Sequence, residues 1–440
     1  METEIDINHQ DEFAAFIGID WAARKHVFAL CDGTADRIEV SEIEHTPEAV
    51  DAWAMELSRR FGERPIAVAL EQVRGALVFM LAKYQHLVIF PIHPATLANY
   101  RKSFRPSGAK GDPHDARLLL DFLLRHRDKL RRIQPDTPET RTLRFLVEER
   151  RKFVDERIRF TQRLCAHLKL YFPQVLNWFC DMSSQIAEDF LERWPTLEEL
   201  QKARTSTIQR FFIDHNSRNA GKIGSRVEDI RRAVPATQDS AVIIASSSAA
   251  LALVGVLRQL RLAISAYDSQ IEKLARAHPD FAIFDSFPGA GAALVPRLIA
   301  ALGTHRDRYR TAHEIQCYSG IAPVVESSGK QHWVHYRRSC PKFLRQTFHE
   351  WALHSIAGSA WAKDYYRQHR ASGQSHHSAV RALAFKWIRI LFRCWQDRTL
   401  YDEAMHGTAR RRRARNEGDS AVQLQWKTCA GFSKLSLQIP

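Results

Sequence analysis

Short apolar runs alternate with turn signals and helical patterns over the first 130 residues of the chain. FAAFIGID and HVFALCD flank a polar turn, which predicts a β-hairpin, and RIEVSEIEH predicts a third strand. An amphipathic helix beginning at Pro47 comes next, then a strand at IAVALE, a helix at GALVFMLAKY and a fifth strand at HLVIFPI. Three adjoining strands followed by β-α-β-α predict a mixed sheet covered by helices, an α/β fold.

From Thr137 the pattern becomes helical. Thr-Pro-Glu at 137–139 is a helix-start signal, with Thr as the N-cap and Pro at the first position. Apolar residues then recur at helical spacing in two long runs: Leu143, Val147, Val154, Ile158, Cys165, Leu168 and Phe172 in the first, and Leu257, Leu260, Ile264, Tyr267, Ile271 and Leu274 in the second. The pattern fits an antiparallel or intermolecular coiled coil, and equally a helical hairpin packed on a core.

These patterns predict four regions along the chain. Residues 1–136 form the α/β domain, and 137–278 carry the long helices with an inserted helical module at about 181–238. Residues 279–405 form a mainly helical domain. The last region, 406–440, contains ARRRRAR and is predicted to be a disordered basic tail.

The charge balance favours a polyanionic partner. The 440 residues include 64 Lys and Arg against 50 Asp and Glu, a formal net charge of +14, which suits nucleic acid first and an acidic membrane surface second. A basic protein with a basic tail would show the same balance. The seven cysteines lack zinc-site spacing, the N-terminus is polar and acidic, and no uninterrupted apolar run approaches about 18 residues. We therefore expect a cytoplasmic protein with no membrane partner.

Four carboxylates stand out by their position in the predicted α/β domain. Asp20 ends the first strand, Glu71 closes the strand IAVALE, and Asp112 and Asp115 lie three residues apart at a helix start. Strand ends bring side chains to a common edge, where such a cluster can hold two divalent cations that activate a nucleophile and stabilise a leaving oxygen in phosphodiester chemistry.

Each of these carboxylates also has a plainer explanation. Asp112-Pro113 with Asp115 fits a helix cap, Glu71 can merely end a strand, and Asp20 can lie at the exposed end of its strand. Asp20 is the hardest to explain this way, because an unpaired buried carboxylate is costly without a cation or hydrogen bonds.

A second constellation is YSGIAPVVESSGKQH at 318–332. Its Ser-Ser-Gly follows a turn and can expose a hydroxyl, and a set of cations follows: Arg337, Arg338, Lys342 and Arg345. A serine beside cations and a metal could attack a phosphodiester and form a covalent link to DNA. On composition alone, Ser-Ser-Gly is equally a simple loop.

A third constellation places Pro-Gly-x-Gly between two helical patterns in FDSFPGAGAALVPRLIAALG. Gly289 and Gly291 resemble the turn of a helix-hairpin-helix, whose backbone N–H groups approach a phosphate. A tight interhelical turn without a ligand fits as well. The aromatic residues from Trp333 to Tyr366 are expected mostly in the core, with one or two free to stack on unpaired bases.

Taken together, the motifs resemble one known family. GID-x-A-x3-H at the start, the Glu after the later strand, and K-x-D-x2-D-A-R are similar to the RuvC-like domain of DEDD transposases of insertion-sequence family 110. FPGAGAALVPRLIAALG and CYSGIAPVVESSG are similar to that family's C-terminal domain, with its G-x-x-P-x4-SG serine motif. The resemblance covers nearly the whole chain.

The resemblance implies a fold, an activity and partners. The fold is a RuvC/RNase H-like domain, a coiled-coil region and a serine-bearing helical domain. The activity is site-specific recombination of double-stranded target and donor DNA, guided by a structured noncoding bridge RNA. A tetrad with Mg²⁺ (or Mn²⁺) assists a serine that becomes joined to DNA; carried over, these residues are Asp20, Glu71, Asp112, Asp115 and Ser328, with Ser327 as its neighbour. The two domains meet from different protomers of a dimer-to-tetramer synapse in the bacterial cytoplasm, associated with the nucleoid.

Other functions fit parts of the same pattern. A junction-resolving metal nuclease would use the same carboxylates with water as the nucleophile. An actin-like ATP-binding protein shares the strand-Asp-hairpin opening, but its phosphate loop needs Gly or Ser/Thr after the Asp, where this chain has Trp21-Ala22-Ala23. A basic architectural protein would leave the four carboxylates without a role.

Overall fold

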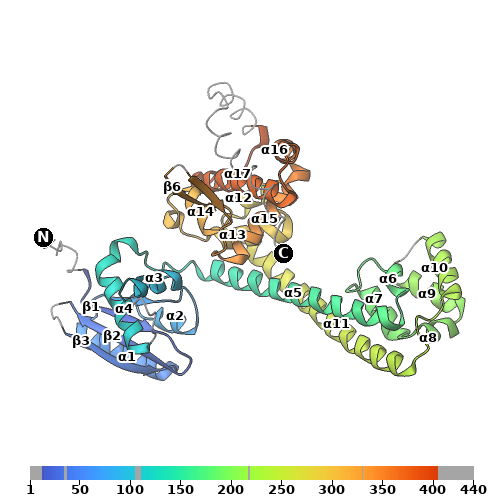
Figure 1. Cartoon of the computed structure of the whole chain (residues 1–440), viewed down its shortest axis with the longest axis horizontal. Coiled ribbons are helices and arrows are strands. Elements are labelled where there is room, and N and C mark those ends of the chain that lie inside the picture. The colour runs from blue at the N-terminus through green and yellow to red at the C-terminus, as the bar shows by residue number, and fades with distance from the viewer. Residues whose placement is uncertain (1–11, 34–36, 105–110, 217–218, 330, 405–440) are drawn as a thin grey trace. The chain divides into compact units, whose positions relative to one another are not determined.

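The computed structural model describes residues 12–33, 37–104, 111–216, 219–329 and 331–404. The chain divides into two compact units, residues 1–135 and 136–440 (Figure 1). The predicted basic tail at 406–440 lies outside the described residues.

The first unit is built on a five-stranded mixed sheet with the order β3-β2-β1-β4-β5. Its first three strands are antiparallel neighbours, and β1, β4 and β5 run parallel. The bounds are β1 Ala15–Asp20, β2 Lys25–Asp32, β3 Ile38–Glu44, β4 Ile66–Leu70 and β5 Leu87–Pro91. The predicted hairpin, the three later strands and the mixed sheet are all confirmed.

Helices cover both faces of this sheet. They are α1 Pro47–Phe61, α2 Ala76–Leu81, α3 Pro94–Phe104 and α4 Asp112–His126, followed by the 3-10 turn η2 Arg127–Lys129. Side chains of β1 alternate between the faces: Ile17 and Ile19 share a core with α1 and α2, whereas Phe16 shares a core with α3 and α4. Because both faces are buried, the inner strands are apolar throughout, and a charge is tolerated only at their ends.

Two long helices organise the second unit, α5 Pro138–Tyr171 and α11 Ser240–Arg276. They pack antiparallel within one chain: Phe153 of α5 contacts Tyr267, and Arg150 of α5 pairs with Asp268 (Figure 1). Thr137 caps α5 as predicted, since its side chain accepts a hydrogen bond from the N–H of Thr140. The predicted apolar seam is buried only near its two ends, and Ile158 at its middle is 46% exposed.

A helical module lies between the C-terminal end of α5 and the N-terminal end of α11. Its helices are α6 Val175–Trp178, α7 Gln185–Arg193, α8 Leu197–Lys202, α9 Thr205–Asp214 and α10 Ala220–Arg232. They share one core with the later part of α5 and the first part of α11, around Phe190 and Phe212.

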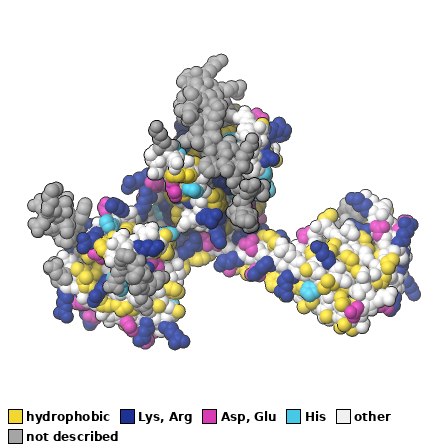
Figure 2. Space-filling view, viewed as in Figure 1, with side chains coloured by type: hydrophobic (Ala, Val, Ile, Leu, Met, Phe, Trp, Pro, Cys, Tyr) yellow, Lys and Arg dark blue, Asp and Glu magenta, His cyan; other side chains and the backbone are white. Residues whose placement is uncertain are grey.

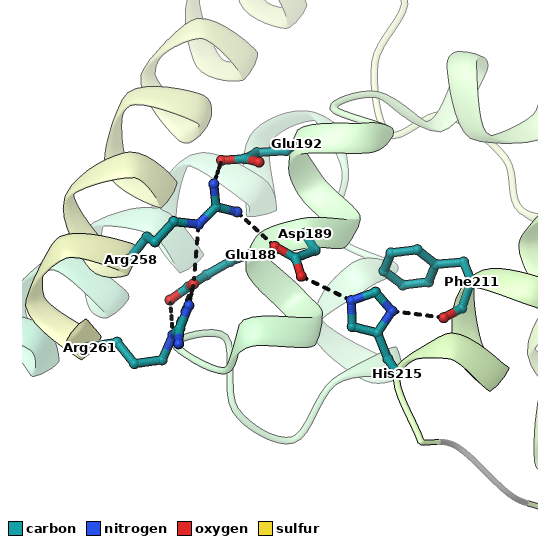
Figure 3. A network of polar contacts seen from close by, with 7 residues as sticks. All are labelled: Glu188, Asp189, Glu192, Phe211, His215, Arg258 and Arg261. Atoms are coloured by element: carbon teal, nitrogen blue, oxygen red, sulfur yellow. Dashed lines mark hydrogen bonds and ion pairs between the residues drawn. The ribbon is translucent and has the colours of Figure 1, made fainter. Parts of the chain in front are cut away.

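A polar network joins this module to α11 (Figure 3). Arg261 donates to the fully buried Glu188, with Nη2 2.8 Å from Oε2. Arg258 pairs with Asp189, which also accepts from His215 at 2.9 Å. Because a buried carboxylate must have its lone pairs satisfied, this network holds α7 against α11.

Helix α11 contains an 18-residue stretch of mean hydropathy 2.1, which by length and composition could cross a membrane. Prediction from uninterrupted apolar runs missed it. One helix of this kind is weak ground for a membrane span, because core helices pass the same test, although only 28% of this stretch is buried. Helix α11 packs against α5, against α7 of the module described above, and against α13 Gly291–Leu302.

The described remainder of the second unit is mainly helical, as predicted, and it also contains a short β-hairpin that the sequence pattern did not predict. Its elements are α12 Phe281–Asp285, α13 Gly291–Leu302, η3 Arg306–Arg308, α14 Ala312–Tyr318, β6 Val324–Ser328, β7 Gln331–His335, α15 Lys342–Gly358, α16 Ala360–Ala371 and α17 His376–Asp397. Helix α13 is almost entirely buried, and Trp351 and Trp387 lie fully inside the same core. Leu143 of α5 and Ile271 of α11 belong to this core too, so the long helices connect two cores.

Candidate active site

Strand register brings two of the predicted carboxylates together. In the parallel pairing of β1 with β4, Ile19 lies opposite Leu70. The next residues are Asp20, which ends β1, and Glu71, which directly follows β4. Neighbouring strands are roughly 5 Å apart, so the two side chains leave the sheet side by side at its carboxyl edge. Both are partly exposed.

A glycine in β1 lets α4 carry a third carboxylate to this edge. A Cβ on Gly18 would lie 2.3 Å from the carbonyl oxygen of Ala116 and 2.4 Å from the backbone nitrogen of Leu120. Helix α4 therefore lies directly on the strand, two residues before Asp20. Asp115, next to Ala116, consequently reaches the ends of β1 and β4.

A pocket of about 510 Å³ collects these side chains. It is lined by Asp20, Glu71, Asp115 and Arg101, together with Pro94, Ala95 and Ala98 at the start of α3. Asp115 is 8% exposed and Arg101 6% exposed. Arg101 Nε donates to Asp115 Oδ1 at 2.9 Å, and Nη2 lies 2.9 Å from the same oxygen. One arginine thus neutralises one of the three carboxylates.

Asp112 begins α4, and its side chain lies outside the described part of the chain. The helix is capped by Gly111 without a side-chain hydrogen bond, so Asp112 is not the N-cap that the plainer explanation required. Asp112 stands one turn before Asp115 on α4, at the end nearest the pocket.

The donor set suits a hard divalent cation. Carboxylate oxygens are the ligands that Mg²⁺ and Mn²⁺ prefer. Among the side chains that the structure describes, no group of three possible ligands lies close enough together to hold one ion. Asp20, Glu71 and Asp115 are the pocket residues that could hold such an ion, and Asp115 is paired with Arg101.

His26 fixes the turn that follows Asp20. Its Nδ1 accepts the N–H of Ala22 at 3.3 Å, and its Nε2 lies 2.8 Å from His45 Nδ1. Since Nδ1 accepts, Nε2 carries the proton and donates to His45. Burial, and then the neighbouring His45, lower the pKa of His26 to about 4, so the ring is neutral at neutral pH. His26 is the last residue of the GID-x-A-x3-H motif, which is the sequence signal for it.

The predicted serine lies at the tip of a hairpin in the second unit. Ser327 pairs with His332 and Ser328 with Gln331, and both serines are exposed. Successive strand residues point to opposite faces, so the two hydroxyls face opposite sides of the hairpin. Arg337 holds the base of the hairpin by donating from Nε to the carbonyl of Ala322 at 3.2 Å.

Cations gather beside the base of this hairpin. Arg345 and Arg381 both lie over the ring of Tyr336, at 5.0 and 4.5 Å from its centroid. Burial lowers the pKa of Arg381, and the nearby charge of Arg345 lowers it further, although an arginine stays charged. Arg338 and Lys342, which lie between Tyr336 and Arg345 in the sequence, are exposed. Arg381 belongs to this cluster only through folding, because it lies on α17, far along the chain from the hairpin, whereas Tyr336 directly follows β7.

The two predicted turn glycines differ in their surroundings. Gly289 has φ +74°, and a Cβ there would lie 2.5 Å from the backbone of His354 and Ser355 in α15. Gly291 has φ +53°, with nothing within 4 Å of a Cβ. Packing against α15 thus accounts for Gly289.

On the visible face of the molecule, Lys and Arg side chains are spread widely rather than gathered in one patch (Figure 2).

Comparison with known proteins gives matches in both units. A family model for DEDD transposases of the IS110 type, described as a transposase, matches residues 17–173. A second, described as the transposase IS116/IS110/IS902 family, matches residues 282–367. Together they cover more than half of the chain, including the carboxylate pocket and the serine hairpin. The chain belongs to the IS110 family of transposases.

Individual IS110-family relatives align over most of their length. The mini-circle protein assigned as a transposase for IS117 of Streptomyces coelicolor is 28% identical over 404 residues, 90% of this chain and 97% of that protein. An uncharacterized 43.6 kDa protein of insertion element IS110 from the same organism is 23% identical over the same shares. An uncharacterized 42 kDa protein of IS900 from Mycobacterium paratuberculosis is 26% identical over 78% of this chain and 85% of that protein.

Proposed function

We propose that this transposase cuts and rejoins DNA strands by attack of Ser328, assisted by divalent cations held by Asp20, Glu71, Asp112 and Asp115. The observation that carries the proposal is the pocket lined by Asp20, Glu71 and Asp115 at one sheet edge. Carboxylate oxygens that line one pocket at a sheet edge are the ligands that a hard divalent cation prefers.

Ser328 would act as the nucleophile. Its Oγ would form a bond to a phosphodiester phosphorus while the bond to one DNA oxygen breaks, and that oxygen leaves as a hydroxyl with the proton lost by the serine. The metal, when bound, supplies stabilisation of the charge that develops on the attacking and leaving oxygens. An exposed serine at a hairpin tip is accessible to a DNA strand, which favours this role over a buried structural one.

The cationic cluster beside the hairpin would hold the nucleic acid. Arg337, Arg338, Lys342 and Arg345 were predicted from sequence to contact phosphates, and Arg381 with Tyr336 extends this set. Guanidinium groups bind phosphate through paired N–H donors and stack on aromatic rings. Gly289 and Gly291 remain candidates for backbone contacts to phosphate, Gly291 better than Gly289 because its surroundings are open.

The carboxylates and the serine lie in different units of the chain. We propose that they meet between protomers of a dimer-to-tetramer assembly that holds target and donor DNA. A structured noncoding bridge RNA would select both DNA sites, as the family resemblance implies. The reaction would take place on the nucleoid in the bacterial cytoplasm.

The second candidate is a RuvC-like nuclease of the junction-resolving type, with water as the nucleophile. It is favoured by the same pocket, which needs no serine to cleave a phosphodiester. The two functions differ in one product. The nuclease leaves nicks, whereas the recombinase passes through a protein joined covalently to DNA.

The deciding experiment traps that covalent species. Purified protein, Mg²⁺, bridge RNA and labelled DNA carrying the element's ends are mixed, and the products are resolved on a denaturing gel. We expect a shifted protein–DNA band with the natural chain, and its loss with Ser328→Ala while RNA binding is kept.

Ser327→Ala is the matched control, because it removes the same hydroxyl from the opposite face of the hairpin. It should keep the covalent band. If Ser327→Ala loses the band and Ser328→Ala keeps it, the nucleophile is Ser327. Nicking without any covalent band would establish the nuclease instead.

A further inference from the structure

A buried arginine shares the carboxylate pocket with the predicted metal ligands. Arg101 lies on α3 one turn after Leu97, and both are buried. Its Nε and Nη2 both reach Asp115 Oδ1, at 2.9 Å each. Two N–H donors on one carboxylate oxygen use both of its lone pairs. That oxygen can bind a cation only by giving up at least one of these contacts.

Charge explains why an arginine lies there. Asp20, Glu71 and Asp115 converge on one pocket, and carboxylates in such a place repel one another unless a cation is present. A buried carboxylate left without a partner destabilises the fold. Arg101 pairs with the buried Asp115 and so supplies a positive charge to the pocket from within the chain.

We propose that Arg101 is the internal counter-ion of the pocket and competes with a divalent cation for Asp115. This inference rests on the proposed function, in which Asp115 is a metal ligand. Metal binding then requires that Asp115 be taken from Arg101, so the chain binds the metal more weakly than its carboxylates alone would. Arg101 is a competitor in this scheme and not a ligand.

An arginine in contact with a metal ligand can instead orient that ligand, and its removal then changes metal affinity in the opposite direction. A partner that only orients a ligand strengthens the site, and its removal weakens metal affinity by about 10- to 100-fold. A competing counter-ion weakens the site, and its removal should tighten metal binding by about tenfold, the effect of losing one nearby positive charge.

The test measures Mn²⁺ binding to the full-length protein by electron paramagnetic resonance, with Mg²⁺ as a competitor. Arg101→Gln should lower the Kd for Mn²⁺ by about tenfold. In the absence of metal, the same variant should have a lower Tm than the natural protein. Adding Mn²⁺ should raise the Tm of the variant by more than it raises that of the natural protein. A Kd that rises or stays the same overturns the proposal.

Two further variants protect the test from misfolding and nonspecific effects. Arg60→Gln removes an arginine whose paired contact is with Glu39, away from the pocket lining, and should leave Kd unchanged. Arg101→Lys keeps the charge but has fewer donors, so Kd should fall by less than in Arg101→Gln. If Arg101→Gln does not fold, an unchanged or raised Kd in Arg101→Lys overturns the proposal.

Asp20→Asn separates this inference from the proposed function. If the natural protein binds no Mn²⁺ and Asp20→Asn changes nothing, the metal role of the pocket is wrong. If Asp20→Asn abolishes Mn²⁺ binding while Arg101→Gln weakens it, the pocket binds metal and only the counter-ion role is wrong.

Discussion

Gly18 determines where the carboxylates of the first unit can lie. Any side chain at this position would collide with the backbone of α4 at Ala116 and Leu120. Without a side chain, α4 rests on β1 and delivers Asp115 to the edge where Asp20 and Glu71 leave the sheet. Asp20 is therefore tolerated in an otherwise apolar strand because it is the last residue, where the sheet gives way to a polar pocket.

His26 gives the first unit a pH-dependent stability. Its pKa is lowered to about 4 in the folded chain, below the ordinary value of about 6.5 in the unfolded chain. The unfolded chain therefore binds more protons between these values, and stability falls as pH drops from about 6.5 to about 4. His26→Gln should weaken this dependence, measured as thermal midpoint against pH.

The same substitution should cost about 1–3 kcal/mol at neutral pH, because it removes the ring that bridges the N–H of Ala22 and Nδ1 of His45. His332→Gln, on the exposed strand β7, is the control and should leave the pH dependence intact. An identical slope in the natural chain and in His26→Gln would show that another group titrates.

At the scale of elements, side-chain packing decides which parts of the long helices are buried. Leu143 and Ile271 join the C-terminal core, and Leu168 and Leu257 join the core of the module. Between these cores the two helices have mainly each other to pack on. That explains why Ile158, in the middle of the apolar spacing, is exposed while residues nearer the two ends of α5 are buried.

The turn between α12 and α13 offers a prediction at this scale. Gly289→Ala should destabilise the C-terminal core by about 3 kcal/mol, because the new Cβ strikes the backbone of α15 at a positive φ. Gly291→Ala should cost only about 1 kcal/mol, since its φ is positive but its surroundings are open. Amide hydrogen exchange in α13 measures both, and equal costs would contradict the packing account.

At the scale of the whole molecule, the candidate chemistry is divided between two units. The pocket lies within residues 1–135 and the serine hairpin within 136–440. A site completed by two different chains would make each chain inactive alone and active in an assembly. Cleavage would then be coupled to the presence of both DNA partners.

Mixing inactive variants tests this division. Asp20→Asn and Ser328→Ala should each be inactive alone, and an equal mixture should regain activity. In a dimer with sites shared between chains, about one site in four would be intact. Recombination by the mixture is the measurement, with the double variant Asp20→Asn/Ser328→Ala plus natural chain as the control for dilution. No recovery would mean that each chain completes its own site.

Sequence patterns by themselves predicted the five strands of the first sheet and the two long helices, and they singled out the four carboxylates, because apolar periodicity and turn residues act over a few positions. The catalytic roles of Asp20, Glu71, Asp112, Asp115 and Ser328 remain predictions. Local pattern offered Asp112 as a helix cap, whereas the N-cap is Gly111. It also missed the apolar stretch of α11.

Only the tertiary structure decided the features that depend on contacts between distant residues. Arg101 was hidden because an arginine four residues after Leu97 looks like an ordinary surface residue until α4 presents Asp115 to it. Arg381 joins Tyr336 and Arg345 from another helix. The sequence alone could not decide whether α5 and α11 pair within one chain or between chains. Burial and charge pairing depend on which residues of other helices and strands lie opposite a side chain, and only the fold of the whole chain determines those neighbours.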